Sequence, residues 1–285
     1  MTYRDNYNSH SKLFGEGASK KTHLIRYNWD MHRFFVPPSS FKGSMIHFPQ
    51  ECARQMAQVL RLNPGCKVIA LDGSGREAVV QLDNLSSREA SGIVLGWQKN
   101  EREPVLHLTV GLALTQREKF EWTLQKVTEI GVSRIVPLVT RRSLVQQTAQ
   151  VLEKVARWQR IIQEAAEQSG RGIVPYLDQP TLLRDFLLLG REFEIALIAW
   201  EGETGRFISR VVHPQDGKNR AGLLIGPEGG WEKEEVEQAE QAGWLPVSLG
   251  KRILRTETAA IVATALLLDR YEANQSGGEN EQTVG

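Results

Sequence analysis

Two glycine-rich stretches near the carboxyl end of the chain hold the residue types best suited to chemistry. The first, residues 226–230 (Gly-Pro-Glu-Gly-Gly), follows a short apolar run and precedes an acidic helix start. Glycine permits positive φ and lets a ligand approach the main chain without meeting a Cβ. The second, residues 250–255, follows the apolar run 245–249 and precedes Thr256, the expected cap of an apolar helix. We expect two loops from neighbouring strands to form two walls of one ligand pocket.

Several arginines at predicted strand and helix ends could supply positive charge to such a pocket. They are Arg141, Arg142, Arg171, Arg252 and Arg255. Arginine forks suit phosphates and polarised carbonyl oxygens. Taken alone, the arginine pair after residue 140 could be exposed strand-end charge, and Glu257 could simply favour its helix start. The joint presence of these residues at strand ends favours a functional role.

Other kinds of chemistry lack their usual signatures. The sequence contains no Walker loop, no recognisable nucleophile setting and no evident carboxylate pair. Its six histidines are scattered and its two cysteines, Cys52 and Cys66, lack ligand spacing, so we expect no metal and a reducing compartment. Residues 73–78 match a loose dinucleotide pattern, but a β-like run follows where that motif needs a helix, which favours a hairpin.

The composition is that of an ordinary globular protein. The 285 residues are 41% hydrophobic and 24% charged, with a net charge of +1. No apolar run reaches the roughly 18 residues of a membrane span, and the amino terminus lacks the apolar core of a signal peptide. We therefore expect a cytoplasmic enzyme or binding protein without nonspecific affinity for nucleic acid.

The pattern of apolar residues divides the chain into two halves. The first half is β-rich and ends near residue 103, with strands expected at 33–36, 67–71, 78–82 and 92–97 and a helix at 49–62. In the second half, strands expected at 105–112, 134–139, 194–200, 223–225 and 245–249 alternate with helices, including 116–130 and 149–168. Such alternation predicts an α/β fold with a mostly parallel sheet covered on both faces.

An ordered set of short motifs resembles one family. The motifs are residues 59–62 (VLRL), 125–132 (QK and EIGV), 137–143 (PL and RS), 167–171 (EQSGR), 226–230 (GPEGG) and 249–259 (LGKRILRTETA). Together they resemble the bacterial methyltransferases that convert a uridine of small-subunit ribosomal RNA to N3-methyluridine. The similarity spans roughly residues 32–271, and the last two motifs are far more specific than a lone glycine loop.

The resemblance implies a fold, a cofactor and partners. It implies a SPOUT methyltransferase domain with a carboxyl-terminal trefoil knot, preceded by a small PUA-like β-barrel for RNA docking. It places the barrel at 31–103 and the methyltransferase domain at 104–272, whereas the polar, aperiodic composition of the two ends predicts a disordered or irregular arm at 1–30 and a flexible tail at 273–285. It also implies S-adenosylmethionine as methyl donor, a homodimer, and small-subunit ribosomal RNA or the assembled subunit as partner.

The resemblance also assigns roles to residues. Residues expected to contact the cofactor are Trp200, Ile225, Gly226, Pro227, Glu228, Gly229, Gly230, Leu249, Gly250, Arg252, Ile253, Leu254 and Thr256. We expect Arg142 or Arg171 to stabilise negative charge on the uracil carbonyls, with Glu257 orienting the second loop. Residues expected to contact RNA are Arg33, Arg54, Arg61 and Arg141. A related enzyme acting on transfer RNA and a non-catalytic RNA-binding assembly factor are the alternatives.

Overall fold

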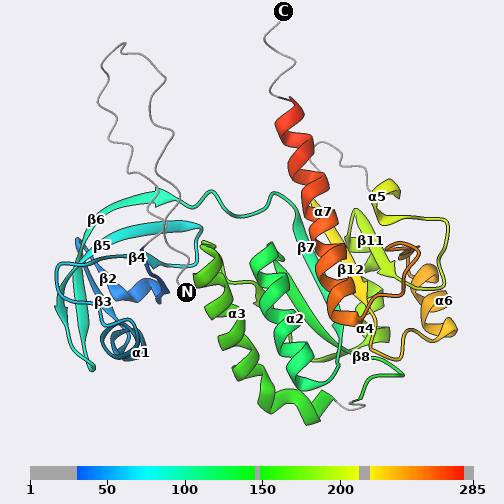
Figure 1. Ribbon diagram of the computed structural model, residues 1–285, viewed down its shortest axis with the longest axis horizontal. Helices are drawn as coiled ribbons and strands as arrows, with labels where there is room; N and C mark the ends of the chain where they lie inside the picture. Colours follow the sequence, from blue (N-terminus) through cyan, green and yellow to red (C-terminus); the bar gives the residue numbers. More distant parts are fainter. Residues whose placement is uncertain (1–30, 145–147, 212–218, 279–285) are drawn as a thin grey trace, which may run out of the picture. The chain divides into compact units, whose positions relative to one another are not determined.

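The computed structural model describes residues 31–144, 148–211 and 219–278, which form two β-sheets with their helices (Figure 1). The predicted arm at 1–30 lies outside the described residues. Among the residues that are described, no helix is both long enough and apolar enough to cross a lipid bilayer.

The first sheet has six strands, in the order β1-β4-β5-β6-β3-β2. Its strands are β1 (Arg33–Phe35), β2 (Phe41–Lys42), β3 (Met45–Phe48), β4 (Lys67–Leu71), β5 (Arg76–Leu85) and β6 (Ala90–Lys99). β1 pairs with β4 in parallel and the other pairs are antiparallel. The sheet packs its apolar face on the short helix α1 (Gln50–Arg54) and the turn that follows it, where Ala53 and Met56 respectively are fully buried.

The structure confirms most of the elements predicted for this half. β4 has the predicted bounds, and β4 and β5 form an antiparallel hairpin, so the turn at residues 73–75 does not belong to a dinucleotide motif. The predicted helix is shorter than expected. α1 continues into a π-helical turn, η2 (Gln55–Val59), and Arg61 takes a positive φ of 52°, which ends the helical path. Short strands β2 and β3 escaped prediction because neither shows a sustained alternation.

The second sheet has seven strands, all parallel, with the path β10-β8-β7-β12-β11-β13 and β9 paired to β8. Its strands are β7 (His107–Ala113), β8 (Arg134–Val139), β9 (Tyr176–Leu177), β10 (Thr181–Leu182), β11 (Ile195–Ala199), β12 (Arg220–Ile225) and β13 (Leu245–Val247). The predicted α/β architecture is confirmed. One expectation was wrong, because β11 lies between β12 and β13 and the two glycine loops do not follow adjacent strands.

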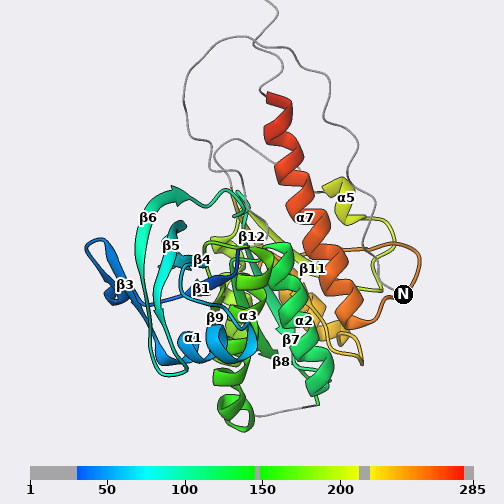
Figure 2. The same cartoon turned by 60° about the vertical axis from the view of Figure 1, so that its left-hand side comes forward.

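Helices cover both faces of this sheet, as Figures 1 and 2 show. They are α2 (Arg117–Ile130), α3 (Val155–Ser169), α4 (Leu183–Leu187), α5 (Ile208–Val211), α6 (Lys233–Gln241) and α7 (Thr256–Gly278). Alternate residues of β12 separate the two cores: Leu223 packs with α2, α3 and α7, and Leu224 packs with α4 and α6. Both faces are therefore buried, as a parallel sheet requires.

Two helix boundaries differ from the predictions. The segment Thr148–Lys154 is a 3-10 helix, so α3 begins only at Val155, and Leu152 in that segment is 50% exposed. Helix α7 continues to Gly278, so the tail predicted from residue 273 begins within a helix. The residues beyond 278 are outside the described part of the chain.

Candidate functional site

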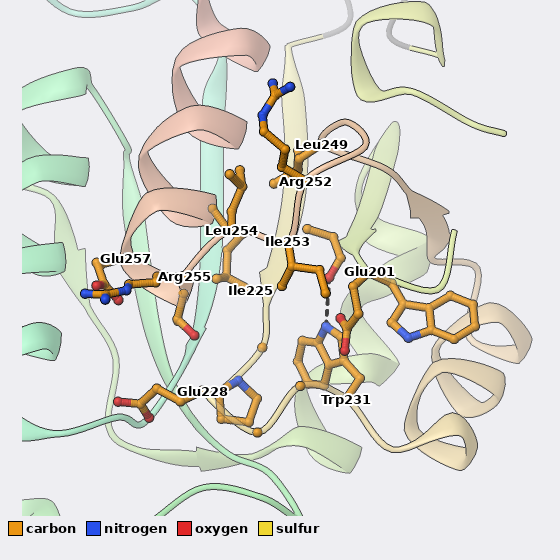
Figure 3. A pocket seen from close by; sticks show the side chains of 18 of the residues that line it. Glu201, Ile225, Glu228, Trp231, Leu249, Arg252, Ile253, Leu254, Arg255 and Glu257 are labelled. Atoms are coloured by element: carbon orange, nitrogen blue, oxygen red, sulfur yellow. Dashed lines mark hydrogen bonds between the residues drawn. The ribbon is translucent and has the colours of Figure 1, made fainter. Parts of the chain in front are cut away.

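A cavity of about 600 Å³ lies where β11, β12 and β13 end, at the carboxyl edge of the parallel sheet. The first glycine loop (residues 226–230) and the second loop (residues 248–255) form its walls, and the start of α7 completes it (Figure 3). Ligands in open α/β sheets bind outside the carboxyl ends of the strands. Every residue predicted to contact a cofactor lines this one cavity.

The first loop is shaped by its glycines and by Trp231. Gly230 has a φ of +73°, which favours glycine, and its backbone N–H donates to the Pro227 carbonyl at 2.9 Å. A Cβ on Gly226 would lie 3.0 Å from the indole ring of Trp231, whose Nε1 donates to the Ala199 carbonyl at 2.9 Å. The tryptophan thereby ties the loop to the end of β11 and leaves no room for a side chain at residue 226.

The second loop joins β13 to α7. Gly250 takes a φ of +123°, and its backbone N–H donates to Ser248 Oγ at 3.3 Å. Thr256 was predicted to be the cap that precedes the helix, but it is the first residue of α7, so the helix begins one residue earlier than expected. Ile253 is 87% exposed, a high value for a large apolar side chain, and it projects into the cavity beside Trp231 (Figure 3). This exposed apolar surface is available to a bound group.

The charged side chains of the cavity fall into two groups. Glu228, Arg255 and Glu257 project toward one side in Figure 3, whereas Glu201 lies beside Trp231 on the other side. The side chain of Arg252 extends away from the other labelled side chains. The apolar surface of the two loops therefore separates acidic groups at both ends of the cavity.

Arg142 lies against the first loop, at the rim of the cavity. Its Nη1 donates to the Gly229 carbonyl at 2.6 Å, and its Nε donates to Glu232 Oε1, also at 2.6 Å. The hydrogen bond that Arg142 donates to the Glu232 carboxylate raises the pKa of the Arg142 guanidinium, which keeps it charged. Of the three residues predicted to be catalytic, Glu257 lines the cavity and Arg142 borders its loop.

The structure does not bring Arg171 to the cavity. Its side chain is 4% exposed, and its Nη2 bonds to Glu103 Oε2 at 2.7 Å. Nη1 donates to the carbonyls of Thr128 and Val132 at 3.0 and 2.7 Å. These contacts hold Arg171 inside the protein, so the expectation that it would face a substrate is not supported by its position.

The arginines predicted to contact RNA lie in different environments. Arg54, the last residue of α1, is exposed, and so is Arg61, which lies just after η2. The Arg33 side chain is only 10% exposed, with its Nε 3.9 Å from the buried carboxylate of Glu77, and burial lowers its pKa. Arg141 is exposed and pairs with Glu234 at 3.2 Å. Arg33 is therefore not presented to solvent as the other three are.

Sequence patterns missed two charged residues that line the cavity in addition to the predicted set: Lys119 and Glu201. Glu201 directly follows the predicted strand 194–200, so the rule that sites lie at strand ends could have found it. Lys119 comes from helix α2, and no local signal marks it. Within the described residues, no group of three or more His, Cys, Asp or Glu side chains could hold a metal ion.

Comparisons with known proteins agree with this geometry. Residues 101–268 match the family model described as an RNA methyltransferase domain. Ribosomal RNA small subunit methyltransferase E of Bacillus subtilis (strain 168) is 30% identical over 253 residues, covering 83% of this chain and 96% of that protein. The protein of the same name from Synechocystis sp. is 33% identical over 236 residues, covering 82% of this chain and 76% of its own length.

A solved structure is similar over the same range. The crystal structure of ribosomal RNA small subunit methyltransferase E from Neisseria gonorrhoeae, bound to S-adenosyl methionine, superposes with a TM-score of 0.77 and 30% identity. The superposition covers 85% of this chain and 98% of that one. The family model and the relatives agree with the glycine-loop cavity and the parallel sheet of this structure. Together they establish that this chain belongs to the ribosomal RNA small subunit methyltransferase E family of RNA methyltransferases.

Proposed function

We propose that this chain transfers a methyl group from S-adenosylmethionine to the imide nitrogen, N3, of a specific uridine in small-subunit ribosomal RNA. The observation that carries the proposal is the cavity at the carboxyl edge of the parallel sheet, lined by both family motifs. The relatives' names specify ribosomal RNA of the small subunit, and the Neisseria gonorrhoeae structure contains the methyl donor.

The cavity has the features that this donor needs. The glycines of the first loop let a ligand approach its main chain closely, and at residue 226 the loop backbone lies directly against the Trp231 indole. Apolar side chains, including Ile225 and Ile253, suit a flat adenine ring, and the carboxylates of Glu201, Glu228 and Glu257 suit a cationic ligand. The cavity volume of about 600 Å³ is within the usual range for small-molecule sites.

S-adenosylmethionine, when bound, supplies a sulfonium methyl group that a nucleophile can displace. The two loops hold and orient it, and the bound nucleobase must face that methyl group in line. Fixing two reactants in this way can lower a barrier by roughly 7 to 11 kcal/mol. The remaining task of the protein is to make the uracil nitrogen nucleophilic, because the imide is protonated and poorly reactive at neutral pH.

Of the two arginines predicted for that task, Arg142 lies nearer to the cavity. It borders the first loop, whereas Arg171 is enclosed by protein. A guanidinium aimed at the uracil carbonyls would favour loss of the imide proton, and Glu257 at the start of α7 would help to orient the second loop. The target base must also leave its stack, which costs a few kcal/mol and favours a substrate in which it is already exposed, such as an assembled subunit.

The finer features of the family extend the proposal. We assign residues 31–103 to a PUA-like RNA-docking domain and 104–272 to a SPOUT methyltransferase domain whose carboxyl-terminal part is knotted. The active form would be a homodimer in the cytoplasm. Arg54, Arg61 and Arg141 are the exposed arginines available for RNA contact.

Mass-spectrometric mapping of ribosomal RNA tests the proposed function. Small-subunit RNA is compared between cells that lack this protein and the same cells after its gene is restored. We expect one N3-methyluridine to be absent in the first sample and present in the second. Methylation found only in transfer RNA would move the substrate to another class, and no change in any RNA would favour a non-catalytic role.

A further inference from the structure

The proposed reaction needs positive charge next to the uracil ring, and the two arginines predicted to supply it do not line the cavity. Arg171 is buried among Glu103 and two backbone carbonyls. Arg142 lies at the rim, with its guanidinium engaged by Glu232 and the Gly229 carbonyl. A cation inside the cavity would be better placed, because a charge stabilises a developing anion most when it is fixed and partly shielded from water.

Three basic residues line the cavity: Lys119, Arg252 and Arg255. The two arginines belong to the second loop, which also forms the proposed donor wall. In Figure 3 the side chain of Arg252 extends away from the cavity, and Arg255 projects toward the side where Glu257 lies. Lys119 differs from both because it comes from helix α2, on another wall.

The backbone at Lys119 is held firmly. The Thr123 hydroxyl donates to the Lys119 carbonyl at 2.8 Å, and the next residue, Phe120, is 2% exposed and packs against Trp158 with ring centroids 4.7 Å apart. Groups on a packed helix are positioned more accurately than groups on loops. The Lys119 side chain therefore extends from a fixed point on the wall of the cavity.

The ammonium group of Lys119 touches the first glycine loop. Its Nζ lies 3.2 Å from Glu228 Oε1, and the two side chains are 37% and 31% exposed. A half-exposed ion pair of this kind contributes only about 0–1 kcal/mol, so the ammonium can exchange part of its contact for a substrate at little cost. Glu228 thus keeps the Lys119 ammonium beside the first loop, and because the pair is partly exposed the ammonium stays accessible to a substrate.

We propose that Lys119 is a catalytic residue of the methyl transfer, whose ammonium group stabilises the uracil anion that attacks. The assignment rests on the proposed function. The imide N3–H bond breaks, its proton passes to solvent water, and its electron pair stays on the ring, shared between N3 and the two carbonyl oxygens. The Lys119 Nζ donates a hydrogen bond to one of those oxygens and favours the ionised form.

A purely structural role for Lys119, as a tether for Glu228, predicts something different. In that case, removal of either partner would disturb the first loop in the same way. If the lysine acts by its charge, the two residues have opposite effects on the bound base. Loss of the cation raises the pKa of the uracil imide, and loss of the Glu228 carboxylate lowers it.

Titration of a fluorinated base tests the proposal without any methyl donor. The uridine located by mass-spectrometric mapping is replaced by 5-fluorouridine in an oligonucleotide, and its ¹⁹F NMR shift is followed against pH when bound to the full-length protein. We expect Lys119→Met to raise the pKa of the bound imide by about one to two units, corresponding to a roughly 10- to 100-fold change in ionisation. Glu228→Gln should lower it, and Lys233→Met, which removes an exposed α6 lysine, should leave it unchanged.

Kinetics provide the second measurement. With saturating donor and RNA, Lys119→Met should lower the single-turnover rate about 100-fold, and Lys119→Arg should retain most of it. The defect should be smaller on the 5-fluorouridine substrate, whose imide ionises more readily. An unchanged imide pKa in Lys119→Met, or equal shifts in Lys119→Met and Glu228→Gln, would overturn the proposal. Failure of the wild-type protein to bind the oligonucleotide would instead count against the proposed function.

Discussion

Two regions of this protein use the same residue types for opposite purposes. In the cavity, the exposed Glu201 and the partly exposed Lys119 lie around bare glycine backbone. In the second region, which we call the seam, Arg171 is buried and Glu103 and Glu167 are partly buried, and their contacts join the two halves of the chain. Glu167 Oε1 accepts the backbone N–H of Phe35 at 2.9 Å.

The difference shows that a residue can belong to a family motif without belonging to the binding site. Residues 167–171 belong to the family pattern as clearly as the glycine loops do, yet they make the seam and not the cavity. Each of the three side-chain nitrogens of Arg171 donates to a protein acceptor, which suits a structural ion pair. Groups that bind a substrate must instead keep part of their hydrogen-bonding capacity accessible.

Arg171→Ala gives the largest expected effect, and it falls on stability. Removing one partner of a buried ion pair leaves an uncompensated carboxylate and typically costs about 3–5 kcal/mol of unfolding free energy. Urea denaturation followed by circular dichroism measures it. A variant of normal stability with a lost methyl-transfer rate would return Arg171 to the active site.

Arg142→Ala should act on rate and leave the fold intact. Loss of one donor directed at developing charge costs roughly 100-fold to 1,000-fold. The single-turnover rate at saturating donor and RNA measures the change, and urea denaturation provides the control. A rate within a fewfold of wild type would exclude Arg142 from the chemistry.

Gly230→Val should weaken donor binding about 100-fold, which corresponds to about 2.7 kcal/mol. The residue has a φ of +73°, and an added Cβ would press on the Glu201 carboxylate. Gly243→Val is the matched control, because Gly243 has a φ of +94° and lies away from the cavity, with only Arg191 Cγ near its added Cβ. Calorimetric titration distinguishes the two. Equal affinity losses in both variants would point to backbone strain and not to the cavity.

Charge reversal at Arg54 and Arg61 should weaken RNA binding more modestly. Each lost phosphate contact lowers the slope of log affinity against log salt by about 0.7 to 0.9. Filter binding over a salt series measures the slope for the double variant. Arg184→Glu, at a 76% exposed side chain on α4, is the control. An unchanged slope in the double variant would place the RNA elsewhere.

Glu167→Gln should have the smallest effect, visible only against pH. Burial raises the pKa of the Glu167 carboxyl, so between about pH 4 and that raised pKa the folded state holds a proton that the unfolded state has lost. Wild-type stability therefore falls as pH rises through this window. Glutamine can still accept the Phe35 N–H, so the variant should lose less stability on going from acid to neutral pH in urea denaturation.

Glu121→Gln is the opposite case and the control for that titration. The hydrogen bond from Arg157 lowers the pKa of Glu121, so its contribution is present above the ordinary carboxyl pKa and is lost as pH falls. Its variant should lose stability at neutral pH relative to wild type and match it in acid. The same pH trend for both variants would show that burial does not raise the pKa of the Glu167 carboxyl.

The sequence predicted local structure better than it predicted long-range contacts. The runs 67–71 and 134–139 match β4 and β8, because apolar β-branched segments ended by turn residues leave little choice. No local pattern could place β11 between β12 and β13, which depends on how the chain crosses the sheet. The bonds of Arg171 to Glu103 and of Lys119 to Glu228 span 68 and 109 residues, and such contacts leave no periodic signal.

The central claim is that the cavity between the two loops binds S-adenosylmethionine, and calorimetric titration of the full-length protein tests it most directly. We predict saturable uptake by the wild-type chain, accompanied by a rise in melting temperature, because a ligand that binds only the folded state stabilises it. Folded wild-type protein that shows neither heat of binding nor thermal stabilisation at millimolar donor would contradict the account.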